Sequence, residues 1–136
     1  MSGASPTAAS PAKQRIRQAF DQAAATYDAA ADVQRDVCDR LAGCLIRDGV
    51  DPVPGAILDA GCGTGYGARW LEERWPQARL ALVDFAPGML AAARIRSPGA
   101  ALICADIEAL PIVECRFDLY WSSLAWQWND PRRCLL

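Results

Sequence analysis

Short apolar runs alternate along the chain with longer stretches whose apolar positions recur at helical spacing. The short runs lie at 56–58, 79–84, 100–104 and 117–122, and they predict buried strands. The periodic stretches predict helices over about 11–25, 31–48, 68–75 and 87–95. Alternating strands and helices predict an α/β fold in which helices flank a parallel sheet.

The first expected helix has a clear start and a basic beginning. Ser10 precedes Pro11, and a capping hydroxyl before a first-turn proline marks a helix start. Its first turns carry Lys13, Arg15 and Arg17. We interpret these charges as a solvated helix face, and a docking surface for an acidic partner is the alternative. Residues 1–10 are small and polar, so we expect a disordered tail there, with a single domain over 11–136.

The second expected helix repeats apolar residues at helical spacing, and we expect them to face the core. These residues are Val33, Val37, Leu41 and Leu45, together with Cys38 and Cys44. Gly49 ends the pattern.

The stretch AILDAGCGTGYG at 56–67 joins a strand to a helix through a glycine-rich turn. Glycines at 61, 63, 65 and 67 let the backbone turn tightly and approach a ligand. Open α/β sheets bind ligands at such a position. The third glycine of the dinucleotide fingerprint is replaced by Tyr66, and no phosphate-loop lysine follows, so neither motif fits. A purely structural turn is the alternative.

Three acids, Asp59, Asp84 and Asp106, each end or follow an apolar run. Because the carboxyl ends of parallel strands share one edge of a sheet, we expect these acids at a common rim. Asp84 follows the glycine turn by about 20 residues, where nucleotide-binding folds place the acid that binds ribose hydroxyls. A carboxylate suits a diol because it accepts both hydrogen bonds. The alternative is a set of loop caps and turn acids.

Composition narrows the classes of function. The chain has 136 residues, 52% of them hydrophobic, which is enough for one domain with a real core. A net charge of -2 argues against a nucleic-acid partner. No apolar run is long enough to span a membrane, and no signal peptide is visible, so no membrane partner is expected.

Six cysteines are present and histidine is absent. No C-x-x-C pair occurs, so we expect no metal site. Several of them sit among apolar residues, and we interpret these as small buried hydrophobes in a reducing, cytoplasmic compartment. Without imidazole, the commonest general base is also missing, and no catalytic base is assigned.

Four motifs together resemble the class I S-adenosylmethionine-dependent methyltransferases. They are DAGCGTG at 59–65, DF at 84–85, ADIEALP at 105–111, and FDL at 117–119 leading to SSL at 122–124. The resemblance implies a Rossmann-like fold with S-adenosylmethionine as cofactor. The cofactor-binding residues that it implies are Asp59, Ala60, Gly61, Gly63, Asp84, Phe85, Met89, Asp106, Ile107 and Ser122.

The same resemblance implies a role for each end of the cofactor. The glycine amides would face the methionine carboxylate, Asp59 would lie near the cationic part, and Ser122 would lie beneath the sulfonium. Asp84 would bind the ribose. Around the adenine, Phe85 and Met89 would flank the ring, and the pair at 106–107 would contact its edge.

A narrower resemblance is to the malonyl-[acyl-carrier protein] O-methyltransferases of biotin synthesis. It rests on AFDQAAATYDAAADVQ at 19–34, DIEALP at 106–111 and LAWQW at 124–128. Such enzymes methylate the free carboxyl of a malonyl thioester on acyl carrier protein. The resemblance implies Tyr27, Gln34 and Trp126 as substrate residues; helix packing and a loop that caps the core are the alternatives.

The chain ends at Leu136, soon after the fourth expected strand. Against this family it resembles an amino-terminal, cofactor-binding part truncated after that strand. The fourth strand would then leave an exposed edge suited to self-association. Two alternatives stay open, namely a methyltransferase with another small-molecule acceptor and a cofactor-binding module without activity.

Overall fold

The computed structural model describes residues 10–29, 31–50, 52–112 and 116–134. The helices are α1 (Pro11–Ala23), α2 (Asp32–Asp48), α3 (Tyr66–Arg74), α4 (Pro87–Arg96) and α5 (Pro131–Cys134), with 3-10 turns η1 (Tyr27–Ala29) and η2 (Trp126–Trp128). The strands are β1 (Ala56–Ala60), β2 (Arg79–Asp84), β3 (Ala101–Cys104) and β4 (Leu119–Trp121). Each predicted strand and helix is confirmed to within a few residues at its ends.

The four strands form one sheet in the order β3-β2-β1-β4, and every neighbouring pair is parallel. Ile57 pairs with Leu80 on one side and with Leu119 on the other. The α/β class and the parallel sheet are therefore confirmed. Within the described residues, β4 is an outer strand, as predicted.

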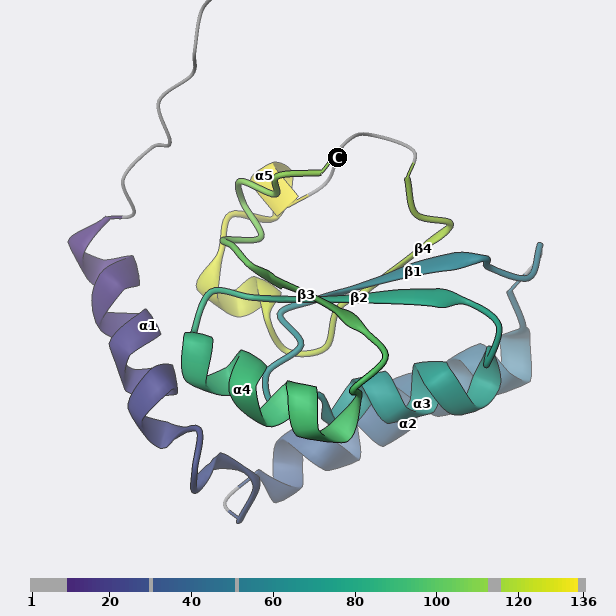
Figure 1. The fold of residues 1–136 in the computed structure, drawn as a ribbon, viewed down its shortest axis with the longest axis horizontal. Coiled ribbons are helices and arrows are strands. Elements are labelled where there is room, and N and C mark those ends of the chain that lie inside the picture. Colours follow the sequence, from purple (N-terminus) through teal and green to yellow (C-terminus); the bar gives the residue numbers. More distant parts are fainter. Residues whose placement is uncertain (1–9, 30, 51, 113–115, 135–136) are drawn as a thin grey trace, which may run out of the picture.

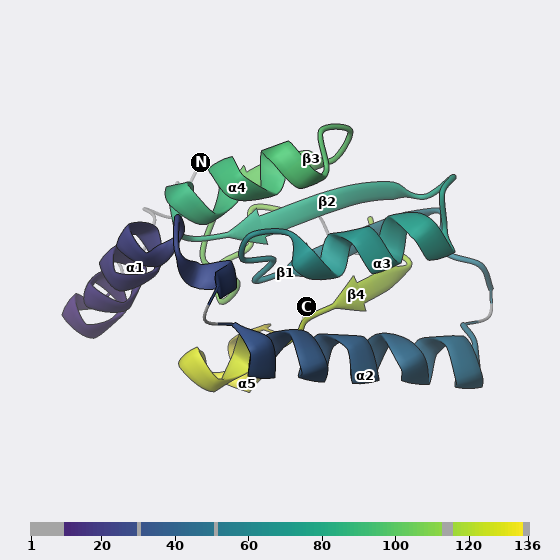
Figure 2. The same cartoon turned by 90° about the horizontal axis from the view of Figure 1, so that it is seen from below.

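The two faces of the sheet are covered differently (Figures 1 and 2). Helices α2, α3 and α4 lie side by side across one face, where Ile57, Leu71 and Trp121 share a core cluster. The opposite face carries Leu58 and Val83 beneath the segment 105–112 and helix α5. Because strand side chains alternate between faces, the continuous apolar runs in β1 and β2 fill both layers.

Helix α2 presents only part of the predicted face to the core. Cys38 and Ala42 are buried, whereas Val33 is 72% exposed and Leu41 is 37% exposed. Small residues face α3 because the helices approach closely there: a Cβ added to Gly67 would lie 3.2 Å from the Cys38 sulfur. The predicted face is confirmed for Cys38 and for Leu45, which packs against the same core cluster, and it was wrong for Val33 and Leu41.

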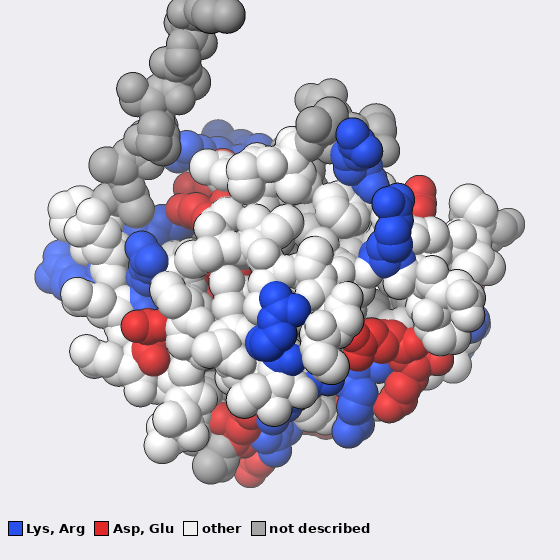
Figure 3. All heavy atoms as spheres, viewed as in Figure 1, with Lys and Arg blue, Asp and Glu red and all other residues white. Residues whose placement is uncertain are grey.

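The five cysteines that the structure describes are free thiols. Cys38, Cys62 and Cys134 are buried, as predicted for several of the cysteines, and Cys44 and Cys104 are exposed. Cys115 lies outside the described residues. No described helix combines the length and apolar character that crossing a bilayer requires. Acidic and basic side chains are interspersed among uncharged atoms on the face shown in Figure 3.

Candidate functional site

The glycine turn between β1 and α3 is tied to the neighbouring strand. Its glycines at 61, 63 and 65 have φ of 76°, 54° and 83°, a region that other residues rarely adopt. The amides of Gly61 and Cys62 both donate to the carbonyl of Val83, at 2.8 and 2.9 Å. The amide of Gly63 donates to Asp84 at 3.0 Å, and that of residue 65 to Cys62 O at 3.0 Å. These four amides, three of them from glycines, already donate within the protein, and the binding of a ligand carboxylate by glycine amides stays a prediction.

Asp84 lies at the carboxyl end of β2, 7% exposed, and is held by the backbone on both sides. Its Oδ1 accepts from the amide of Ala86 at 2.9 Å, and its Oδ2 from that of Gly63 at 3.0 Å. Burial raises the pKa of Asp84, and these amides partly offset the rise. The carboxylate is therefore fixed in place beside the turn.

Asp59 lies near the end of β1 and is 2% exposed. Burial first, and the nearby Asp84 second, raise its pKa to about 8. The side chain is therefore mostly protonated at neutral pH and can donate a hydrogen bond.

Two cavities open at this end of the sheet and share part of their lining. The larger has a volume of about 240 Å³ and contains the predicted residues Tyr27, Gln34, Gly61, Gly63, Asp84, Phe85, Met89, Asp106 and Ile107. The smaller has a volume of about 70 Å³ and includes Asp59, Arg35 and Thr64. Tyr27, Gln34, Gly61, Gly63 and Ser123 line both. The three strand-end acids therefore do gather at one rim, with Asp59 on the smaller cavity and the other two on the larger.

Aromatic rings form one wall of the larger cavity. The ring of Phe20 lies 6.1 Å from that of Tyr27, 6.3 Å from that of Phe85 and 6.0 Å from that of Trp128, between ring centres. All four residues line the cavity. Phe20 and Trp128 were not predicted as site residues, although each belongs to a stretch that carried the family resemblance.

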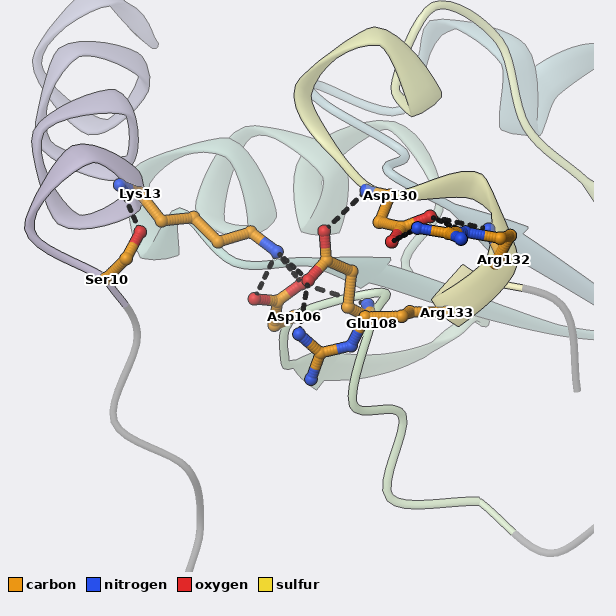
Figure 4. A network of polar contacts seen from close by, with 7 residues as sticks. All are labelled: Ser10, Lys13, Asp106, Glu108, Asp130, Arg132 and Arg133. Carbon is orange, nitrogen blue, oxygen red and sulfur yellow. Dashed lines mark hydrogen bonds and ion pairs between the residues drawn. The ribbon is translucent and has the colours of Figure 1, made fainter.

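Lys13 closes another part of the wall (Figure 4). Its Nζ lies 2.6 Å from Asp106 Oδ1 and 3.2 Å from Glu108 Oε2, and its side chain is only 13% exposed. Glu108 also accepts from the amide of Asp130 at 2.7 Å. The network joins α1 to the loop after β3 and to the start of α5. The interpretation of Lys13 as part of a solvated face was therefore wrong.

Asp28, in the 3-10 turn η1 that also contains Tyr27, connects this turn to the glycine turn. Thr64 Oγ1 donates to Asp28 Oδ1 at 2.7 Å, and Arg96 pairs with its other oxygen. Partial burial would raise the pKa of Asp28, but the hydrogen bonds from Thr64 and Arg96 outweigh it and lower the pKa. Tyr27 is thereby positioned where the two cavities join.

Three predicted residues lie outside the lining of both cavities. The Ser122 hydroxyl donates to the carbonyl of Ala60 at 2.8 Å, and the Ala60 side chain is fully buried. Trp126 packs edge-on against Tyr120, with ring centres 6.4 Å apart. Their proposed roles in binding stay predictions. Ser123, which lines both cavities, was not predicted.

Comparison with known proteins defines the class of protein to which this chain belongs. Residues 57–136 match the family described as "Methyltransferase domain", and the chain belongs to that family. It is 48% identical over 133 residues to the malonyl-[acyl-carrier protein] O-methyltransferase of Laribacter hongkongensis and 48% identical over 120 residues to that of Dechloromonas aromatica. Each match covers 88% of this chain and 43% of the relative, so the chain spans less than half the length of these relatives.

Solved structures share the fold. A complex of the Haloferax volcanii Trm112 methyltransferase activator with a methyltransferase matches with a TM-score of 0.70 and 26% identity, over 85% of this chain and 51% of that one. Phosphoethanolamine N-methyltransferase 1 of Haemonchus contortus, solved with phosphoethanolamine and S-adenosylhomocysteine, matches with a TM-score of 0.69 at 15% identity, over 90% of this chain and 27% of that one. The second likeness is one of fold alone.

Proposed function

We propose that the protein binds S-adenosylmethionine in the two joined cavities and methylates the free carboxylate of a malonyl thioester on acyl carrier protein, a step in biotin precursor synthesis. Membership of the methyltransferase domain family supports the reaction class. The names of the two relatives at 48% identity support the acceptor. The observation that carries the proposal is the pair of joined cavities beside the glycine turn, at the carboxyl ends of the strands.

The lining fits the chemistry of this cofactor. Phe85, Met89 and Ile107 offer apolar surfaces for a purine in the larger cavity. Asp84 lines the larger cavity and accepts a hydrogen bond from the amide of Gly63, which lines both cavities. A ribose diol in the larger cavity can therefore donate to Asp84. A Cβ at Gly63 would meet nothing within 4 Å, so the backbone there leaves open space for a ligand. The smaller, more polar cavity suits an amino-acid end.

When bound, the cofactor would supply an electrophilic methyl group on sulfur. A carboxylic acid with a pKa of about 4 is already ionised at neutral pH, so the acceptor needs no general base. Burial first, then Asp84 and Asp28, raise the pKa of Tyr27, which therefore stays a neutral phenol. At the junction of the cavities, Tyr27 and Gln34 can donate hydrogen bonds that orient a carboxylate.

The aromatic wall around Phe20 would exclude water from the reacting groups. Alignment of this kind lowers a barrier by up to about 7–11 kcal/mol in well-oriented systems. The face of Tyr27 can also stabilise a sulfonium, by about 0.5–2 kcal/mol. Trp126, which the resemblance implies as a substrate residue, packs against Tyr120 outside the cavity lining.

The test is transfer of a labelled methyl group to malonyl-acyl carrier protein. The assay should use this chain and a chimera that continues it after Leu136 with the matching remainder of the Laribacter hongkongensis enzyme. The proposal expects base-labile methyl ester formed by the chimera. Binding of S-adenosylhomocysteine without transfer by either protein would favour a cofactor-binding module, and transfer only to another small acid would change the acceptor.

We also propose a compartment and a mode of self-association for the protein. We place the protein in the cytoplasm, which the free thiols of the five described cysteines support. Self-association through the outer edge of β4 is proposed from its unpaired backbone groups within the described sheet. Light scattering after size-exclusion chromatography tests the second point, and a monomer at all concentrations would contradict it.

A further inference from the structure

Arg35 lines the smaller cavity from the first turns of α2. Its guanidinium lies over the ring of Tyr66, 5.4 Å from the ring centre. Its Nε is shielded from water and has no hydrogen-bond acceptor among the residues that the structure describes. A buried donor without an acceptor is costly and rare in native proteins, so it indicates a partner that is still to be identified.

The acid that faces Arg35 is shared with other groups. Its Nη2 lies 3.8 Å from Asp28 Oδ1, a loose contact, and that carboxylate also serves Arg96 and the Thr64 hydroxyl. Two guanidiniums therefore share one carboxylate. Asp59, on the same cavity, is mostly protonated at neutral pH because burial raises its pKa to about 8. On the smaller cavity, Arg35 thus has no acid of its own and keeps an unused donor.

Four backbone amides of the glycine turn are already used within the protein. The amides of residues 61, 62, 63 and 65 all donate to acceptors within the protein. A guanidinium, by contrast, presents parallel N–H groups that match the two oxygens of a carboxylate. The donor set therefore favours a carboxylate over a larger or a neutral group.

We infer that Arg35 binds a ligand carboxylate in the smaller cavity, an inference that rests on the proposed function for the identity of the ligands. Two sources share this chemistry. One is the amino-acid end of the cofactor, and the other is the free carboxylate of the acyl acceptor. Either carboxylate could reach the smaller cavity, because Tyr27 and Gln34 line both this cavity and the larger one.

Calorimetric titrations of the chain and of Arg35→Ala distinguish the sources. The probes are S-adenosylhomocysteine, 5′-methylthioadenosine, which lacks the amino-acid end, and malonyl-pantetheine added to the chain saturated with S-adenosylhomocysteine. If the carboxylate is the cofactor's, S-adenosylhomocysteine binds about ten- to a hundredfold more weakly to the variant while methylthioadenosine binds equally well. If it is the acceptor's, only malonyl-pantetheine binding weakens. Arg35→Lys, which keeps the charge and loses the fork, should recover part of the affinity.

Arg69→Ala is the matched control. Arg69 lies over the same ring, 5.9 Å from its centre, but pairs with Glu73 on the surface and does not line the cavity. It should leave all three affinities unchanged, and thermal unfolding should show that each variant folds. Equal affinities for the Arg35→Ala variant and the parent overturn the inference, as does an equal loss for both nucleosides, while the proposed function stands. A parent chain that binds neither nucleoside overturns both.

Discussion

Gly61 lies where the glycine turn passes closest to the segment after β4, and its replacement by alanine has a cost that the structure defines. A Cβ there would lie 2.3 Å from the Cβ of Ala125, whereas apolar atoms in contact are about 4 Å apart. Relieving such an overlap in a packed site costs about 1–3 kcal/mol. The φ of 76° adds about 1–2 kcal/mol for a residue with a side chain. We therefore expect Gly61→Ala to lower the free energy of unfolding by about 2–5 kcal/mol.

Urea unfolding followed by circular dichroism measures this loss. Gly63→Ala is the control in the same turn, because its φ is 54° but its Cβ would meet nothing within 4 Å. It should cost only the backbone part, about 1–2 kcal/mol. The double variant Gly61→Ala/Ala125→Gly removes the overlap and keeps the backbone strain, so the double-mutant cycle should show a coupling of about 1–3 kcal/mol.

The reasoning is refuted if Gly61→Ala and Gly63→Ala cost the same, or if the cycle shows no coupling. Either result would mean that the turn and Ala125 are not in close contact. Gly63→Ala should nevertheless weaken S-adenosylhomocysteine binding, because its Cβ enters space that both cavities share.

Three other variants test separate contacts. Asp59 holds its proton more tightly in the folded state, where its pKa is about 8. The stability that it contributes is therefore full below about pH 4 and is lost as the pH rises to about 8, at up to about 1.4 kcal/mol per pH unit. Asp59→Asn should abolish this slope in urea titrations across that pH range, and an unchanged slope would contradict the assignment. Asp118 Oδ2 accepts from two amides at the start of β1, at 2.8 and 2.9 Å; Asp118→Ala should cost about 1–3 kcal/mol and Asp118→Asn clearly less, whereas equal losses would exclude these bonds. Lys13→Met should lower the unfolding free energy by about 1–3 kcal/mol, since it removes the cation that pairs with the partly buried Asp106 and leaves Glu108 with Arg133 alone, and an unchanged urea midpoint would show that the Lys13 pairs contribute nothing.

The strands and the rim of acids could be predicted because local patterns determine them. Apolar runs such as Arg79–Asp84 become buried strands in any parallel sheet, and the carboxyl ends of those strands meet by topology. The face of α2 could not be predicted in the same way. Periodicity shows that apolar positions recur, but the close approach of α3 at Gly67 selects Cys38 rather than Val33 for the interface.

Site residues that were missed depend on long-range geometry. Lys13 pairs with Asp106 across 93 positions of sequence, which a local charge pattern cannot reveal. In the segment after β4, Leu124 has a φ of 56°, and a 3-10 turn follows. This backbone places Trp128 in the cavity lining and Trp126 against Tyr120. Two tryptophans in one motif therefore have different surroundings, and the sequence gives no local sign of which is which.

The central claim is that the joined cavities at the rim of the sheet hold a sulfonium nucleoside. Calorimetric titration with S-adenosylhomocysteine, beside NADH and the Asp84→Ala variant, tests it most directly. We expect one site per chain, no heat from NADH, and at least about tenfold weaker binding by the variant, because the ribose loses hydrogen bonds to a charged acceptor. A parent chain that binds NADH instead, or a folded variant that binds S-adenosylhomocysteine as tightly as the parent, would contradict the account.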